Sequence, residues 1–231
     1  MGHMITITAT GSEGEIPAYV AQPEGAAKAA IIVIPEIFGL NAGIRSKVDG
    51  WAQLGYLAIA PDIFWRFAAG VELDPDVPEQ LQQSFGYFQQ YDADLGVDDI
   101  KATLAWTKAE GAAKTGLVGF CLGGRLAYMA ATRTTVDASV GYYGVMIDTM
   151  LDEAAHITKP LALHIPTADH FVSPEAQAAM HAGLDANAHV TLWDYQGLDH
   201  GFAAETGNRR DDAAAELADQ RTRDFLAANL A

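Results

Sequence analysis

One cysteine stands in a residue pattern typical of an enzyme nucleophile. Cys121 lies in the run Gly-Phe-Cys-Leu-Gly at 119–123, between an apolar run that predicts a strand and a pattern that predicts a helix. A strained turn of this kind exposes the central side chain, and glycines on either side permit close backbone approach. The start of the helix also stabilises a thiolate. The pattern predicts covalent catalysis by Cys121, and a cysteine packed as a small apolar side chain is the alternative interpretation.

A cysteine nucleophile needs a histidine base and an acid that orients the base, and two loops offer them. Asp169 follows the predicted strand 161–165, and His200 follows the predicted strand 190–195. Hydrolases with this kind of turn place nucleophile, acid and histidine in that order along the chain. The loops after parallel strands leave the sheet at one edge, so we expect the side chains of Cys121, Asp169 and His200 to converge.

Two neighbouring residues compete for the same roles. His170 stands beside Asp169, but it precedes a capped helix, where an imidazole more often faces solvent. Asp199 stands beside His200, and that adjacency makes it less natural for this carboxylate to orient the imidazole. His164, Asp169 and His170 also offer metal-ligand atoms, but their spacing matches no zinc signature and His164 falls within a predicted buried strand. We therefore expect neither a metal ion nor a cofactor.

The composition favours a folded globular protein that binds neither nucleic acid nor a membrane surface. The chain has 231 residues, 50% of them hydrophobic, and 14 basic against 30 acidic residues give a formal net charge of −16. Such a charge repels phosphate backbones and anionic lipids, and no apolar run approaches the roughly 20 residues of a spanning helix. A single cysteine fits a reducing compartment, so we expect a cytoplasmic protein. One domain is expected over residues 4–231, with residues 1–3 interpreted as a cloning remnant.

The pattern along the chain predicts an α/β fold with a mostly parallel central sheet, helices on both faces and no large cap domain. Residues 5–10 and 15–21 predict an antiparallel edge hairpin around the turn Gly11-Ser12-Glu13-Gly14. The other predicted strands are 30–34, 56–60, 116–119, 138–143, 161–165 and 190–195. Helical spacing predicts helices at 45–54, 79–91, 97–110, 122–132, 174–184 and 211–229. The stretch 64–78 predicts a surface excursion near the carboxyl edge of the sheet.

Several motifs, in order along almost the whole chain, resemble the dienelactone hydrolase family of the α/β-hydrolase fold. The motifs are Pro35-Glu36-Ile37-Phe38-Gly39, Gly55-Tyr56, Pro61-Asp62, the run 119–124, Gly141-Tyr142-Tyr143-Gly144, Asp169-His170-Phe171-Val172 and His200-Gly201-Phe202. The resemblance implies that Cys121, Asp169 and His200 form the catalytic triad.

The resemblance also assigns roles to an early loop. It implies an oxyanion hole formed by the backbone N–H groups of Ile37 and Leu122, which agrees with the geometry expected for acyl transfer. In that family a glutamate in the early loop contacts the cysteine and governs when it becomes a thiolate. Glu36 occupies the matching position.

Two positions depart from the family's pattern and bear on the substrate. The family holds a substrate carboxylate with two arginines, and the matching positions here are Leu81 and Ala204. Neither side chain donates a hydrogen bond, so we expect a preference for neutral or weakly polar esters and lactones. The preference would reverse if another arginine replaced this pair, and the candidates are Arg66, Arg125, Arg209 and Arg210. The predicted substrate pocket comprises Leu81, Phe85, Phe88, Tyr142, Phe171, Phe202 and Ala204.

Together these features predict a hydrolase that cleaves an ester or lactone of a small molecule through a Cys-His-Asp triad and a thioester acyl-enzyme. A general carboxylesterase or thioesterase is the alternative among enzymes. From a different class, a non-catalytic small-molecule-binding homologue would keep the fold without turnover. We expect a monomer or a small homo-oligomer.

Overall fold

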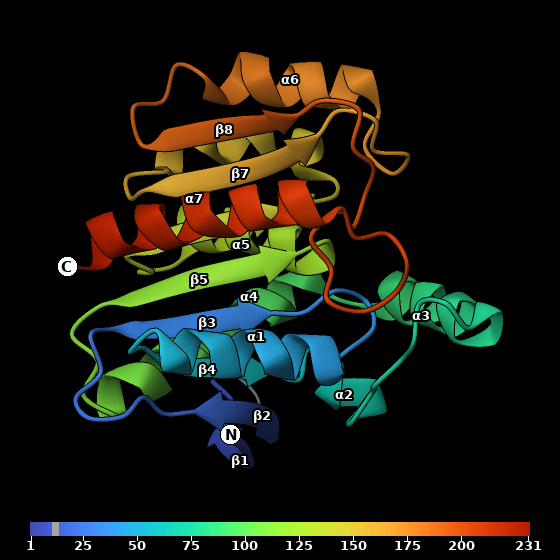
Figure 1. The fold of residues 1–231 in the computed structure, drawn as a ribbon. Helices are drawn as coiled ribbons and strands as arrows, with labels where there is room; N and C mark the ends of the chain where they lie inside the picture. Colours follow the sequence, from blue (N-terminus) through green and yellow to red (C-terminus); the bar gives the residue numbers. More distant parts are fainter. Residues whose placement is uncertain (11–13) are drawn as a thin grey trace.

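A computed structural model describes residues 1–10 and 14–231, and over these residues eight strands form one sheet in the order β1-β2-β4-β3-β5-β6-β7-β8 (Figure 1). The strands are β1 (His3–Thr8), β2 (Glu15–Ala21), β3 (Ala30–Ile34), β4 (Leu57–Pro61), β5 (Thr115–Phe120), β6 (Ala138–Tyr142), β7 (Leu161–Pro166) and β8 (Val190–Tyr195). β2 pairs antiparallel with β1 and β4, and the remaining neighbours pair in parallel. The mostly parallel α/β sheet that the sequence predicts is confirmed.

Helices cover both faces of this sheet. They are α1 (Ala42–Gln53), α2 (Trp65–Ala68), α3 (Pro78–Gln90), α4 (Ala93–Ala109), α5 (Leu122–Arg133), the 3₁₀ segment η1 (Ile147–His156), α6 (Pro174–Leu184) and α7 (Asp212–Leu230). α1 and α7 lie on one face and α4 and α5 on the other, while α3 projects beyond the carboxyl ends of the central strands (Figure 1). Among the described helices, none has both the length and the apolar composition needed to cross a membrane.

The central strands are apolar throughout because helices cover both of their faces. Every residue of β3, β4 and β5 is buried. A fully buried Val, Leu or Ile side chain contributes about 1.5–3 kcal/mol relative to an exposed one. These strands therefore form a rigid platform, and the loops at their carboxyl ends can hold side chains in fixed positions.

The start of α4 and the segment η1 are among the features that differ from the sequence-based prediction. α4 begins at Ala93 rather than near residue 97, because the side chain of Asp92 accepts hydrogen bonds from the backbone N–H groups of Asp94 and Leu95 and so caps the helix earlier. The segment η1 has no counterpart in the prediction. It is kinked at Met150 and has 3₁₀ geometry, so its side chains do not follow the 3.6-residue period of an α-helix.

The bounds of the first strand also differ from the predicted range 5–10. β1 begins at His3, within the segment interpreted as a cloning remnant, and His3 pairs with Val20 of β2. The antiparallel pairing of β1 with β2 at this edge of the sheet is confirmed. Residues 11–13 of the predicted turn lie outside the described residues.

Candidate active site

The turn between β5 and α5 has the strained geometry that its Gly-x-Cys-x-Gly pattern predicts. Cys121 has φ 56° and ψ −112°, a conformation that residues with a side chain rarely adopt. A Cβ on Gly119 would lie 1.9 Å from the carbonyl oxygen of Gly123, and a Cβ on Gly123 would lie 2.3 Å from that of Ile34. Only glycine fits at these two positions. The close backbone approach that they permit holds Cys121 at the carboxyl edge of the sheet, directly before α5.

Backbone hydrogen bonds to β6 and to α5 fix the position of Cys121. The N–H of Cys121 donates to the carbonyl of Tyr142 at 3.0 Å, and its own carbonyl accepts from the N–H of Arg125 at 3.1 Å. Leu122 is the first residue of the helix, so its N–H has no acceptor one turn earlier. Ile37, the other expected oxyanion donor, follows β3 and lines the same cavity as Cys121. The geometry thus places both expected donor residues at the cysteine.

Asp169 and His200 come from two neighbouring loops, which we name the acid loop (residues 167–173, after β7) and the histidine loop (residues 196–211, after β8). The Nδ1 of His200 lies 2.9 Å from the Oδ2 of Asp169, and the two side chains are 4% and 1% exposed. The other oxygen of Asp169 accepts a hydrogen bond from the N–H of Phe171 at 2.8 Å. A carboxylate only accepts, so Nδ1 of His200 carries a hydrogen and Nε2 faces away from the acid.

The charge on His200 depends on both of its partners. Burial lowers its pKa, but the negative charge of a Cys121 thiolate and the hydrogen bond to Asp169 outweigh burial and raise the pKa to about 10. The buried Nε2 has no hydrogen-bond partner within the described residues, and His200 and Cys121 line one cavity. The site therefore favours a protonated imidazole beside Cys121.

Glu36 lies after β3 in the same cavity and is 8% exposed. Burial raises the pKa of its carboxyl, and the charges of His200, Lys47 and Arg209 only partly offset this effect. The neutral form of the carboxyl is therefore more favoured in the site than in water. The buried hydroxyl of Tyr143 lies beside this carboxyl, and burial together with Glu36 raises the pKa of Tyr143 well above its ordinary value. Sequence reasoning did not single out Tyr143, although its place directly after β6, in a motif of the resemblance, was the available signal.

The cavity at Cys121 is lined mostly by apolar surface. Of the residues predicted for the substrate pocket, Leu81 and Phe85 line it from α3, Phe171 from the acid loop and Ala204 from the histidine loop. The remaining lining residues are Glu36, Ile37, Phe38, Pro75, Cys121, His200, Gly201, Thr206, Gly207 and Arg209. The surface excursion and α3 thus bring Pro75, Leu81 and Phe85 over the cysteine.

Tyr142 was predicted to line this cavity, and the structure contradicts that prediction. Its hydroxyl bonds to Asp219 at 2.9 Å and to Thr222 at 2.6 Å, both in α7, and its ring stacks on His164 at 4.1 Å. Successive residues of a strand point to opposite faces of the sheet, so Tyr142 faces α7 while the site lies elsewhere. It lines a separate cleft between α1 and α7.

Two more residues predicted for the substrate pocket, Phe202 and Phe88, are not among the described residues that line the cavity. Phe202 is 1% exposed and packs against Tyr195 and Tyr143 with ring centroids 4.7 Å and 5.7 Å apart, so it supports the histidine loop from within the core. Phe88 packs against the core two turns after Leu81 in α3. It lies three residues after Phe85, about 4.5 Å further along the helix, and is not among the described lining residues.

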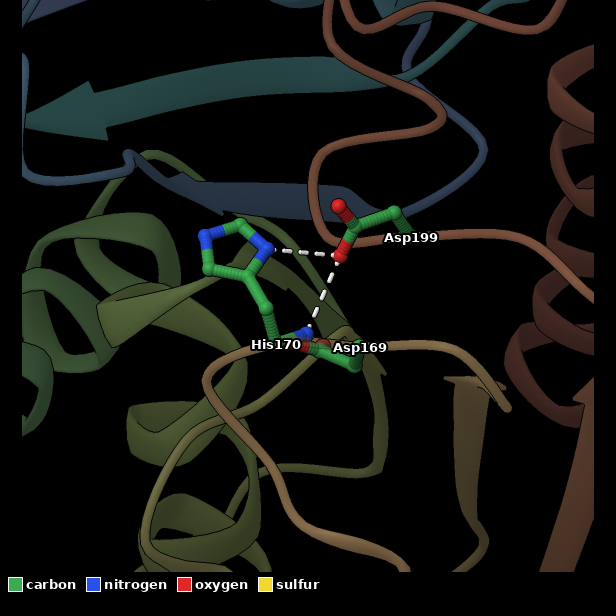
Figure 2. Close-up of side chains that lie close together, drawn as sticks. All are labelled: Asp169, His170 and Asp199. Atoms are coloured by element: carbon green, nitrogen blue, oxygen red, sulfur yellow. Dashed lines mark hydrogen bonds and ion pairs between the residues drawn. The ribbon is translucent and has the colours of Figure 1, made fainter.

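His170 and Asp199, the alternative candidates for the base and the acid, pair with each other. The Nδ1 of His170 lies 2.7 Å from the Oδ1 of Asp199, and these side chains are 49% and 57% exposed (Figure 2). Ligand atoms of Asp169, His170 and Asp199 lie within 4.8 Å of one another, as in a metal site. Both oxygens of Asp169 already accept hydrogen bonds, and His164 is bonded elsewhere through both ring nitrogens. The geometry is that of a hydrogen-bonded cluster.

Arg209 of the histidine loop lines the cavity, unlike the other arginines considered as substitutes for the family's pair. Those have partners elsewhere: Arg66 with Asp99, Arg125 with Met146, and Arg210 with Glu205 and Asp212. Arg209, five residues after Ala204, therefore places a cationic residue at the cavity.

Known proteins are similar to this chain over most of its length. The sequence profile of the dienelactone hydrolase family matches residues 16–230. The chain belongs to the dienelactone hydrolase family. A protein of Azospirillum brasilense, provisionally named a carboxymethylenebutenolidase, is 39% identical over 227 residues, which cover 95% of this chain and 96% of that protein. The carboxymethylenebutenolidase of Pseudomonas putida is 35% identical over 212 residues, covering 91% of this chain and 90% of the relative.

Solved structures agree with the fold. A crystal structure from Klebsiella pneumoniae, provisionally named a dienelactone hydrolase, superposes with a TM-score of 0.85 at 25% identity and covers 98% of each chain. The protein therefore has the α/β-hydrolase fold, and its family makes it a hydrolase.

Proposed function

We propose that the protein hydrolyses an ester or lactone of a small molecule through Cys121, His200 and Asp169, with a thioester acyl-enzyme as the intermediate. The observation that carries the proposal is the buried His200–Asp169 hydrogen bond, which lies at a cavity shared with the strained Cys121. The names of the relatives also support it, since carboxymethylenebutenolidases recur among them. The proposed reaction uses only groups of the chain and water.

Acylation begins with attack of the Cys121 thiolate on the substrate carbonyl carbon. A C–S bond forms, and the carbonyl π electrons move to oxygen, where the N–H groups of Ile37 and Leu122 stabilise the negative charge. The oxyanion then collapses and the C–O bond to the leaving group breaks. Nε2 of His200 gives its proton to the leaving alkoxide. In a lactone the released hydroxyl stays attached to the acyl group.

Deacylation returns the enzyme to its starting state. Neutral His200 takes a proton from water through Nε2, and the water oxygen attacks the thioester carbon. The tetrahedral intermediate breaks its C–S bond and releases the carboxylic acid and the Cys121 thiolate. Asp169 holds the imidazole in one orientation and stabilises its protonated form throughout.

Glu36 governs the charge state of the empty site in this proposal. Its buried carboxyl lies in the cavity with Cys121 and His200, and its pKa is raised by burial. A protonated Glu36 adds no negative charge beside the thiolate, whereas an ionised Glu36 repels it. Tyr143 lies beside Glu36 and would hold the carboxyl in place.

We further propose that the substrate carries an anionic group at the Arg209 end of the cavity. The sequence-based preference for neutral esters depended on the absence of a substitute arginine, and Arg209 lines the cavity. A guanidinium binds a carboxylate through charge-assisted hydrogen bonds. The apolar part of the substrate would pack against Leu81, Phe85 and Phe171.

A pre-steady-state burst tests the proposed activity. We expect the purified protein to release about one equivalent of p-nitrophenol from an activated aryl ester in a fast phase, followed by slower turnover. The Cys121→Ala variant should show neither phase while keeping its circular dichroism spectrum. Turnover retained in Cys121→Ala would contradict the nucleophile assignment, and binding without product release would identify a non-catalytic homologue.

A substrate comparison separates the specific activity from the general alternatives. Rates for a lactone, an aryl ester and an acyl thioester, each with a free carboxylate, report which acyl linkage the site prefers. We expect the lactone or ester to exceed the thioester in kcat/KM. The opposite order would favour a thioesterase.

A further inference from the structure

One oxygen of Asp199 joins the acid loop to the histidine loop. Its Oδ1 accepts hydrogen bonds from the ring Nδ1 of His170 at 2.7 Å and from the backbone N–H of His170 at 3.0 Å, as Figure 2 shows. The same oxygen accepts from the backbone N–H of His200 at 2.6 Å. The carboxylate therefore holds the backbone of both loops, one residue away from Asp169 in the first and at His200 itself in the second.

This link continues the pairing of β7 and β8 into the loops. The N–H of Thr167 donates to the carbonyl of Tyr195 at 3.0 Å, and the N–H of Ala168 donates to the carbonyl of Leu198 at 2.9 Å. The bonds to Asp199 come next along both loops. Of these bonds between the two loops, they are the ones nearest to the Asp169–His200 hydrogen bond.

The charge of Asp199 suits this role. Burial raises its pKa, but the hydrogen bonds from His170 and from the N–H of His200 together outweigh burial and lower the pKa. Exposed ion pairs contribute little to stability by themselves, because water competes for both groups. Two of the three hydrogen-bond donors to Asp199 are backbone N–H groups. The carboxylate therefore constrains the backbone of both loops as well as the side chains of His170 and Asp199.

The ring of His170 extends the link to the imidazole of His200. Its centroid lies 3.9 Å from that of Phe171, and the Phe171 ring meets the His200 ring at 4.8 Å with an interplanar angle of 81°. Phe171 also lines the substrate cavity. Fixing His170 through Asp199 therefore restricts the aromatic side chain that packs against the catalytic imidazole.

We propose that Asp199 is a positioning residue, which holds His200 and Asp169 in the geometry that the proposed triad needs. The inference rests on the proposed function. Without this carboxylate the two loops lose the link nearest to the triad, and the His200–Asp169 bond and the direction of Nε2 become variable. Misplacement of a catalytic group by about 1 Å can reduce a rate about 100-fold.

Steady-state kinetics of two variants give the first test. Asp199→Ala removes the acceptor and should lower kcat about 10- to 100-fold with little change in KM, because substrate contacts remain. Asp199→Asn keeps an acceptor oxygen for the backbone N–H groups and should recover most of the lost rate. The matched control is Asp185→Ala, which removes another exposed histidine–aspartate pair, since the Nδ1 of His181 lies 3.1 Å from Asp185. This control should leave kcat unchanged.

Two measurements on the resting protein separate this proposal from the proposed activity. The hydrogen-bonded Nδ1 proton of His200 should give a downfield proton NMR signal, which Asp199→Ala broadens through faster exchange and Asp185→Ala leaves intact. Iodoacetamide should alkylate Cys121, the one cysteine of the sequence, more slowly in Asp199→Ala. Both readouts need no substrate, so they decide the role of Asp199 even if every tested ester fails to react.

The results that would overturn the proposal are equally definite. An unchanged NMR signal and an unchanged alkylation rate in folded Asp199→Ala would show that the link does not position His200. If Asp199→Ala fails to fold, the same readouts are taken from Asp199→Asn and from His170→Ala. In that case both variants should show smaller changes in the same direction, and wild-type behaviour in both would contradict the role.

Discussion

Nδ1 of His200 and Oδ2 of Asp169 lie 2.9 Å apart in a hydrogen bond from which solvent is excluded, since the side chains are 4% and 1% exposed. The neighbouring pair of His170 and Asp199 is shorter, at 2.7 Å, but about half of each side chain is exposed. Water competes for the outer bond, whereas the inner bond keeps its full electrostatic strength. Burial, and not bond length, distinguishes the proposed catalytic pair.

The two histidines should therefore differ in substitution experiments. His200→Ala removes the proposed proton carrier and should lower kcat/KM by about 100- to 10,000-fold, whereas His170→Ala should lower it less than about 10-fold. Initial rates with a common ester, on variants with matched thermal unfolding, check this. Similar losses in the two variants would contradict the assignment of His200.

The raised pKa of His200 makes the stability of the protein depend on pH. The pKa in the folded state is about 10, above the ordinary value near 6.5, so folding favours the protonated form. This contribution to the free energy of unfolding is complete below about pH 6.5 and is lost as the pH rises through about 10.

Urea unfolding at pH 7 and pH 10 measures this contribution. Asp169→Asn removes the charge that pairs with His200, so it should lose less stability between the two pH values than the wild type does. Because both proteins keep Cys121, the difference between them reports the effect of the Asp169 charge alone. Asp185→Asn, a change at an exposed pair, serves as the control and should follow the wild type. Equal losses in wild type and Asp169→Asn would refute the coupling.

Arg209 should determine how the enzyme treats a carboxylate on its substrate. Arg209→Gln should lower kcat/KM about 10- to 100-fold for a lactone with a free carboxylate, because a hydrogen bond to a charged group contributes about 1.5–3 kcal/mol. The matching methyl ester should be hydrolysed at nearly the same rate by both proteins. Arg223→Gln, at a surface ion pair with Glu216, is the control. A wild-type preference for the methyl ester would instead support the neutral substrate predicted from Leu81 and Ala204.

The strained turn at Cys121 predicts a large difference between two glycine substitutions. Gly123→Ala places a Cβ 2.3 Å from the carbonyl oxygen of Ile34 and should destabilise the protein by about 2 kcal/mol or more. Gly86→Ala, in α3 with nothing within 4 Å of its Cβ, should stabilise it by about 0.4–1 kcal/mol. Thermal unfolding compares the two, and a Gly123→Ala variant as stable as wild type would contradict the packing at the turn.

Sequence patterns predicted those parts of the site that depend on local backbone geometry. The glycines around Cys121 leave few alternatives for the turn, and the order of strands brings the loops of Asp169 and His200 to one edge. Which aspartate pairs with which histidine is harder to predict, because Asp169 and Asp199 each stand next to a histidine in the sequence. The structure pairs each histidine with the aspartate of the other loop, and only tertiary packing determines that choice.

The substrate pocket was predicted less well, because lining residues depend on side-chain direction. Tyr142 and Tyr143 are adjacent, yet Tyr142 faces α7 and Tyr143 lies beside Glu36. A shift of one residue along a strand moves a side chain to the opposite face of the sheet, and composition carries no information on which face a side chain takes. Arg209 reaches the cavity through the course of the histidine loop, which has no periodic pattern to predict it.

The central claim is that Cys121 carries the acyl group during turnover, and mass spectrometry after rapid quenching tests it most directly. The protein is mixed with an aryl ester, quenched in acid during the burst and digested. We predict the mass of the acyl group on the peptide that contains Cys121, in a proportion that matches the burst amplitude, and its disappearance as deacylation completes. An unmodified Cys121 peptide during active turnover, or the acyl group on another residue, would contradict the account.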